Sequence, residues 1–141
     1  MTNRFSSQEL QVKEWLKRAE DDELNARSIL THRDGTPNGV CFLSHQMAEK
    51  YLKSFLVYKK KWFPKIHLLD KLLELCSKID NSFLKLKNDA IFLNAFYTPT
   101  RYPADYQEFS WKEAEQALKT ATRIKDFVLT KIWSSQKRIS K

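Results

Sequence analysis

The chain has 141 residues, of which 42% are hydrophobic and 30% are charged, and its formal net charge is +8. This length and composition are typical of one globular domain and exclude a disordered, fibrous or collagen-like chain. With two glycines and four prolines, the sequence disfavours a β-sandwich or β-barrel and cannot form a G-x-G-x-x-G phosphate-binding loop.

The first predicted helix spans about residues 7–32. Ser6 and Glu9 have the spacing of a capping box, and apolar residues recur at helical intervals from Val12 onward. Asp22 interrupts this apolar stripe. It either lies exposed where the stripe drifts, or faces inward, where a buried carboxylate needs a partner. For the second case there are three candidate partners: Lys50, Lys53 and Arg101.

The second predicted helix spans about residues 37–60, because Thr36 suits an N-cap and Pro37 the first helical position. Apolar residues cover more than half of its circumference, so we expect a central helix packed on several sides. Four polar residues fall within an arc of about 100°: Gln46, Glu49, Lys50 and Lys53. His45 lies four residues before Glu49. This arc is either a solvent-exposed face or the lining of a crevice or interface.

Three further helices are predicted at about residues 66–79, 83–96 and 111–132, followed by a frayed basic tail at 133–141. Ser110 and Glu113 have capping-box spacing before the last of them. The chain contains no internal repeat and no long linker. We therefore predict an all-α fold: an up-and-down helical bundle of four long helices plus a shorter one, forming a single domain over residues 1–141 with its core at about 8–132.

The sequence predicts a cytoplasmic protein without a metal or cofactor. No apolar run is long enough to cross a membrane, and the first ten residues are more polar than a signal peptide. Cys41 and Cys76 lack the spacing of a metal site or redox motif, so we interpret them as core residues in a reducing compartment.

Two loops and one histidine are candidate binding elements. Two prolines stiffen the segment around Arg101 and Tyr102, which suits recognition of an anion or a base, although a structural connection with a surface ion pair is the alternative. The loop at 59–62 is basic and aromatic and suits phosphate contact, but short lysine runs are usually only solvated. His67 stands alone before the third helix, where a capping or buried hydrogen-bonding role is more common than ligand binding.

Three segments together resemble HEPN domains. They are WLKRAEDD at 15–22, FLSHQMAEKYLK at 42–53 and YTPTRYP at 97–103, and His67 precedes a leucine-rich helix as in that family. The order and spacing are similar over about residues 8–130. The resemblance implies a helical bundle, often a homodimer with a cleft near the dyad. It also implies a genetic neighbour, a minimal nucleotidyltransferase, with which small prokaryotic members form toxin–antitoxin or nucleotide-handling modules.

Many HEPN proteins are metal-independent ribonucleases, with a motif of arginine followed after four to six residues by histidine. Arg101 matches the arginine, but no histidine follows His67 in the chain. Tyr106 stands near the histidine position, and tyrosine is a poor base at neutral pH because its usual pKa is about 10. The resemblance therefore favours binding over catalysis in this chain.

We predict a nucleotide-binding or nucleotidyltransferase-partner subunit, in a homodimer, of a two-component module. The candidate ligand-binding residues are Asp22, His45, Glu49, Lys50, Lys53, His67, Tyr97, Arg101, Tyr102 and Tyr106. One alternative is a ribonuclease toxin with a degenerate motif, in which Arg101 is catalytic and His45 or His67 replaces the missing histidine. In related pairs the transferase silences the toxin by modifying a tyrosine, for which Tyr102 and Tyr106 are candidates. The other alternative is a structural homodimer without ligand.

Overall fold

The computed structural model describes the backbone of residues 6–97 and 107–140, and the side chains as far as Trp133. The elements are α1 (Ser7–His32), α2 (Pro37–Tyr58), α3 (Leu69–Ile79), the 3-10 helix η1 (Asn81–Leu86), α4 (Lys87–Asn94) and α5 (Trp111–Ser140). These described residues contain helices and no strand, so the predicted all-α bundle is confirmed.

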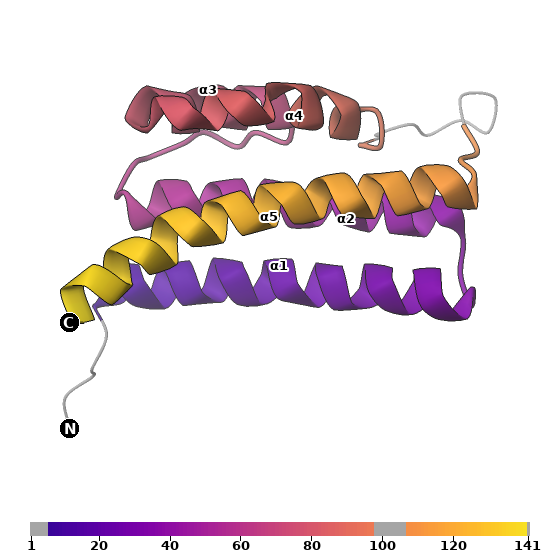
Figure 1. Cartoon of the computed structure of the whole chain (residues 1–141), viewed down its shortest axis with the longest axis horizontal. Helices are drawn as coiled ribbons and strands as arrows, with labels where there is room; N and C mark the ends of the chain where they lie inside the picture. Colours follow the sequence, from indigo (N-terminus) through magenta and orange to yellow (C-terminus); the bar gives the residue numbers. More distant parts are fainter. Residues whose placement is uncertain (1–5, 98–106, 141) are drawn as a thin grey trace.

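The helices form a long layer and a short one. α1, α2 and α5 run along the length of the molecule, and the shorter α3 and α4 lie on the side away from α1 (Figure 1). α1 packs mainly against α2, which also contacts α5, α3 and α4. α2 is therefore the central helix expected from its apolar circumference, and most of its positions from Val40 to Leu56 are buried.

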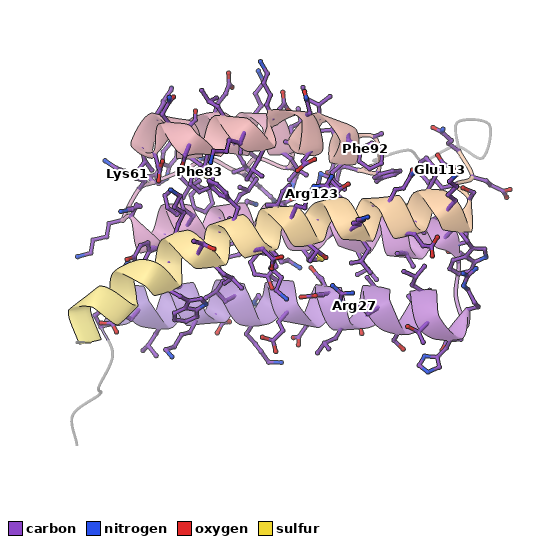
Figure 2. All side chains as sticks on the ribbon, in the orientation of Figure 1. Arg27, Lys61, Phe83, Phe92, Glu113 and Arg123 are labelled. Atoms are coloured by element: carbon purple, nitrogen blue, oxygen red, sulfur yellow. The ribbon has the colours of Figure 1, made fainter. Side chains whose placement is uncertain are left out.

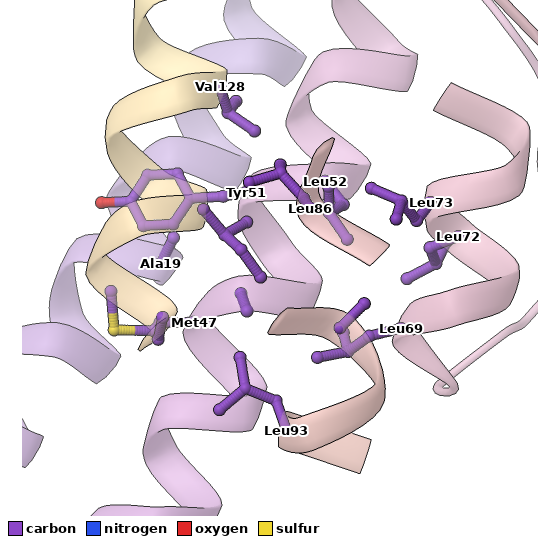
Figure 3. Close-up of a cluster of buried hydrophobic side chains, with 14 of the residues drawn as sticks. Ala19, Met47, Tyr51, Leu52, Leu69, Leu72, Leu73, Leu86, Leu93 and Val128 are labelled. Atoms are coloured by element: carbon purple, nitrogen blue, oxygen red, sulfur yellow. The ribbon is translucent and has the colours of Figure 1, made fainter. Parts of the chain in front are cut away.

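A cluster of large apolar side chains holds the short helices against α2. Figure 3 shows side chains from both layers in this cluster: Ala19, Met47, Tyr51, Leu52, Leu69, Leu72, Leu73, Leu86, Leu93 and Val128. Burying a leucine stabilises the fold by about 2 kcal/mol. This packing fixes α3 beside α2 and so determines the path of the residues that precede α3, including His67.

The helix starts predicted from capping residues are confirmed. Ser6 and Glu9 form the capping box of α1, and the Thr36 hydroxyl accepts a hydrogen bond from the Gly39 N–H at the start of α2. Ser110 and Glu113 form the same reciprocal pair of hydrogen bonds before α5. Local side-chain chemistry thus sets these three starts.

Several predicted boundaries differ from the structure. α3 begins at Leu69 rather than near residue 66, because its N-terminus is capped by a distant side chain: the Leu69 N–H donates to Asn94 Oδ1 at 2.8 Å. The predicted helix at 83–96 is instead η1 followed by α4. α5 continues past the expected end near residue 132 to Ser140, and no glycine or proline lies in that stretch to end it.

No helix in the part of the chain that the structure describes combines the length and the apolar character needed to cross a membrane. Cys41 and Cys76 are both buried free thiols. Burial, together with the nearby Glu113 carboxylate, raises the pKa of Cys41 to about 12, and burial also raises the pKa of Cys76 above its usual value. Both thiols are therefore protonated, packed side chains.

Candidate functional site

The candidate site is a row of polar side chains on α2, which we call the polar strip: His45, Gln46, Glu49, Lys50 and Lys53. α1 flanks it through Asp22, and the chain before α3 flanks it through His67. His45, Glu49 and Lys53 are buried, with 0%, 4% and 6% of their surface exposed. Polar groups buried to this degree require partners, so the strip is an enclosed site rather than a solvated face.

Glu49 and Lys53 form a buried ion pair at the centre of the strip. Lys53 Nζ donates to Glu49 Oε2 at 2.8 Å. The same ammonium group lies 5.6 Å from the ring centre of Trp15 and 5.9 Å from that of Phe63, within the range of cation–π attraction. The aromatic rings exclude water, so the pair interacts more strongly than it would on the surface.

His67 extends this pair toward solvent. Its Nδ1 lies 3.3 Å from Glu49 Oε2, and 39% of its side chain is exposed. When Nδ1 carries the proton and donates to Glu49, the carboxylate fixes the orientation of the ring and leaves Nε2 as an acceptor. An imidazole oriented by a carboxylate is suited both to binding polar ligand groups and to proton transfer.

Tyr97 packs against two histidines at the end of the described chain before residue 98. Its ring stacks on His67, with 5.3 Å between ring centres and 15° between planes, and lies 5.1 Å from the ring of His45. The three rings form an aromatic wall of the site. Because Arg101, Tyr102 and Tyr106 fall in the stretch after Tyr97, they lie outside the described residues.

Two polar atoms of the strip lack partners. Among the described residues, His45 Nε2 and Glu49 Oε1 are buried without a hydrogen bond, whereas His45 Nδ1 lies 3.2 Å from Gln46 Oε1. Burial lowers the pKa of His45 below its usual value, although Gln46, Glu49 and the backbone of His67 act in the opposite direction, so its ring is neutral at pH 7. Unsatisfied buried groups are destabilising unless a bound molecule supplies the missing hydrogen bonds.

Asp22 faces inward from α1, so the second of the two alternatives for its place on the apolar stripe is correct. Its carboxylate accepts a hydrogen bond from Lys50 Nζ at 2.5 Å, and the two side chains are 15% and 24% exposed. Lys50 is therefore its partner within the described residues, whereas Lys53 pairs with Glu49 and Arg101 lies outside the described part of the chain. Each lysine of the strip pairs with its own carboxylate, so a phosphate would have to compete with Asp22 for Lys50.

Sequence reasoning overlooked two features around the strip. It gave no role to the Trp15 and Phe63 rings beside Lys53. It placed Glu23 with Asp22 in the break of the apolar stripe but gave it no role, whereas Glu23 is buried and accepts hydrogen bonds from Arg27 and Lys125, each at 2.8 Å. The long charged residues of α5 gave no signal for such a contact, because exposed and pairing lysines look alike in sequence. Within residues 6–97 and 107–140, no group of three His, Cys, Asp or Glu side chains could hold a metal ion.

Comparison with known proteins identifies the family. The family model of the HEPN domain matches residues 12–133. The chain belongs to the HEPN family. No curated protein matches the chain.

Two solved structures resemble this HEPN protein over nearly their whole length. The archaeal HEPN homologue ST0689 is 31% identical, with a TM-score of 0.70, and the match covers 86% of this chain and 97% of that one. TT1696 from Thermus thermophilus is 27% identical, with a TM-score of 0.72, and the match covers 84% of this chain and 95% of that one. The structural similarity to these two helical proteins thus agrees with the family assignment from the sequence.

Proposed function

We propose that this HEPN protein is a nucleotide-binding or nucleotidyltransferase-partner subunit of a two-component, toxin–antitoxin-like module, acting as a homodimer in the cytoplasm. The observation that carries the proposal is the buried Glu49–Lys53 pair with His67 on its solvent side, where Glu49 Oε1 and His45 Nε2 make no hydrogen bond among the described residues. A stable fold retains such atoms at a site where a ligand completes their hydrogen bonds.

The chemistry of the strip matches the parts of a nucleotide. A base offers exocyclic N–H donors to a carboxylate such as Glu49 and to an imidazole nitrogen that acts as an acceptor. The His67 ring, which stacks on Tyr97 and has 39% of its side chain exposed, suits contact with an aromatic base. Lys50 is partly exposed beside Asp22, so a phosphate group can attract its ammonium. In the proposal, Arg101 supplies a second phosphate contact and Tyr102 stacks on the base.

Isothermal titration of the full chain with ATP and with GTP tests nucleotide binding. We expect saturable heat with at least one of them, and at least a tenfold weaker affinity in His67→Gln because the oriented imidazole is lost. His32→Gln is the matched control, since His32 is an exposed histidine at the far end of α1 whose ring lies against the Ser28 carbonyl of its own helix. Absence of heat with both nucleotides would favour a structural homodimer without ligand.

The partner half of the proposal has its own test. Co-expression with a minimal nucleotidyltransferase encoded beside this protein should yield a complex that survives size-exclusion chromatography. Mass spectrometry should then find a nucleotidyl group on Tyr102 or Tyr106 after incubation with nucleotide. A transferase that neither co-elutes nor modifies the chain would contradict the partnership.

A ribonuclease is the second candidate function, and the pairing of His67 with Glu49 favours it. Cleavage by attack of the 2′-hydroxyl requires a group that accepts its proton and a group that protonates the leaving oxygen. The oriented His67 imidazole can serve in place of the histidine that the family motif lacks here. Expression of the wild-type chain should then arrest growth, and Arg101→Ala and His67→Ala should each abolish the arrest. Normal growth with the wild-type chain would exclude this function.

A further inference from the structure

A cavity lies outside the polar strip, between the start of α1 and the loop after α2. Its volume is about 470 Å³, in the range of small-molecule pockets, and its lining includes Gln8, Gln11, Trp15, Lys60, Lys61 and Trp62. The rings of Trp15 and Phe63 separate it from the Glu49–Lys53 pair, because both rings also contact Lys53. The cavity is thus a neighbour of the strip and not part of it.

The backbone at Lys60 is unusual for a lysine. α2 ends with the Lys61 N–H donating to the Leu56 carbonyl and the Lys60 N–H donating to the Val57 carbonyl, each at 2.9 Å. In this C-terminal motif the residue at the position of Lys60 adopts the left-handed conformation and is usually glycine. Lys60 adopts it with φ of 58° despite its side chain. A side chain retained in a disfavoured conformation points to a use for that side chain.

The side chains at the cavity have unused binding capacity. In the part of the chain that the structure describes, no hydrogen bond or ion pair engages the ammonium groups of Lys60 and Lys61. The neighbouring Trp62 is 83% exposed, more than any other large hydrophobic residue described. Gln8, in contrast, already uses its side-chain amide within the cavity wall, because the amide donates to the carbonyls of Val57 and Tyr58.

We propose that this cavity binds a nucleobase together with its phosphate. Trp62 stacks on the base, and Lys60 and Lys61 contact the phosphate. An exposed aromatic ring beside free cations is the combination that binds single nucleotides and single-stranded nucleic acid without reading sequence. The amide of Gln11, which makes no hydrogen bond within residues 6–97 and 107–133, adds a polar contact. This site does not depend on nucleotide binding at the polar strip, and either can fail without the other.

Tryptophan fluorescence of the full chain at low salt, titrated with AMP and separately with octauridylate, tests the proposal. We expect quenching that is absent in Trp62→Ala. Quenching by AMP identifies a free nucleotide as the ligand source, and quenching by octauridylate alone identifies a single strand. For octauridylate, Lys61→Gln should lower the salt dependence of log K by about 0.7, the value for one lost phosphate contact. His32→Gln, whose exposed histidine at the end of α1 lies outside the cavity and the polar strip, should bind both probes as the wild type does.

Lys112→Gln is the control for charge. Lys112 is an exposed lysine in the first turn of α5. Glu113, the next residue in the chain, lies at the opposite end of the molecule from Lys61 (Figure 2). Lys112→Gln should leave the affinity unchanged. An equal loss of affinity in Lys112→Gln and Lys61→Gln, or no quenching by either probe, would overturn the site.

Lys60→Gly separates binding from folding. Glycine relieves the left-handed conformation, so the midpoint of thermal unfolding should rise by about 3 °C. The affinity for the bound probe should nevertheless fall severalfold, because one phosphate contact is lost. A variant that is more stable and binds as the wild type does would show that Lys60 has no role in binding and would overturn the assignment.

Discussion

Glu49 is the residue on which the polar strip depends. One of its oxygens accepts from Lys53 and lies within reach of His67, while the other makes no hydrogen bond among the described residues and lies 3.9 Å from His45 Nδ1. Removing one member of a buried ion pair leaves the other charge uncompensated, which costs far more than breaking a pair whose members reach water. The Glu49–Lys53 pair is buried, whereas the Asp22–Lys50 pair is partly exposed to water.

Glu49→Gln should therefore lower the free energy of unfolding by about 3 kcal/mol, because Lys53 remains buried without a carboxylate. Asp22→Asn should lower it by about 1 kcal/mol at most, because Lys50 is 24% exposed and can be hydrated. Urea unfolding of both variants at one protein concentration measures the difference. Equal losses would contradict the burial assigned to the Glu49–Lys53 pair.

His45 makes stability depend on pH. Burial lowers the pKa of its ring in the folded state below the unfolded value of about 6.5. Below that pH the unfolded chain binds a proton that the folded chain does not, so the free energy of unfolding should fall as the pH decreases from 7 to 5. His45→Leu should flatten this dependence. A variant with the wild-type pH profile would mean that His45 is not the group responsible.

At the scale of elements, a buried carboxylate joins α1 to α5. Glu23 is 6% exposed and accepts from Lys125 of α5 and from Arg27 of its own helix. Burial raises the pKa of Glu23, but the hydrogen bonds from Lys125 and Arg27 outweigh it and hold the pKa below its usual range. The carboxylate is therefore charged and fixes the register of α1 along α5.

Glu23→Gln should lower the free energy of unfolding by about 2 kcal/mol at pH 7, which is typical for hydrogen bonds to a charged group. Because the folded pKa is depressed, the wild-type advantage should disappear as the pH falls from about 4.5 through that lower value. Chemical unfolding of both proteins at pH 7 and pH 3 measures this. An advantage that is no smaller at pH 3 than at pH 7 would contradict the role assigned to the charge.

The sequence predicts helices best where the signals are local. Ser6, Thr36 and Ser110 mark helix starts because each caps a backbone N–H within three residues. The start of α3 could not be predicted, since its cap comes from Asn94 at the end of α4. A helix end defined by a tertiary contact leaves no pattern in the adjacent residues.

The same distinction applies to the candidate site. The Glu49–Lys53 pair follows from spacing on one helix, and the inward position of Asp22 follows from a charge on an apolar stripe. The approach of His67 to Glu49 could not be predicted, because it requires the loop after α2 to return along that helix. Periodicity carries no information about the path of a loop.

At the scale of the whole molecule, the described surface leaves apolar side chains in water that a dimer would cover. Phe42, Leu68 and Phe92 are each about two-fifths exposed. We expect sedimentation equilibrium to give twice the monomer mass at micromolar concentration. The masses of Phe42→Glu and Leu68→Glu should be compared with that of the wild type by the same measurement. A wild-type chain that remains monomeric at all concentrations would contradict the proposed homodimer.

The central claim is that a nucleotide binds at the polar strip, and NMR of the histidine rings tests it most directly. The chain has three histidines, of which His45 and His67 belong to the site and the exposed His32 does not. On titration with ATP or GTP, the ring signals of His67 and His45 should shift and saturate while that of His32 stays fixed. Ring signals of His67 and His45 that do not move at millimolar nucleotide, or that move no more than His32, would contradict the claim.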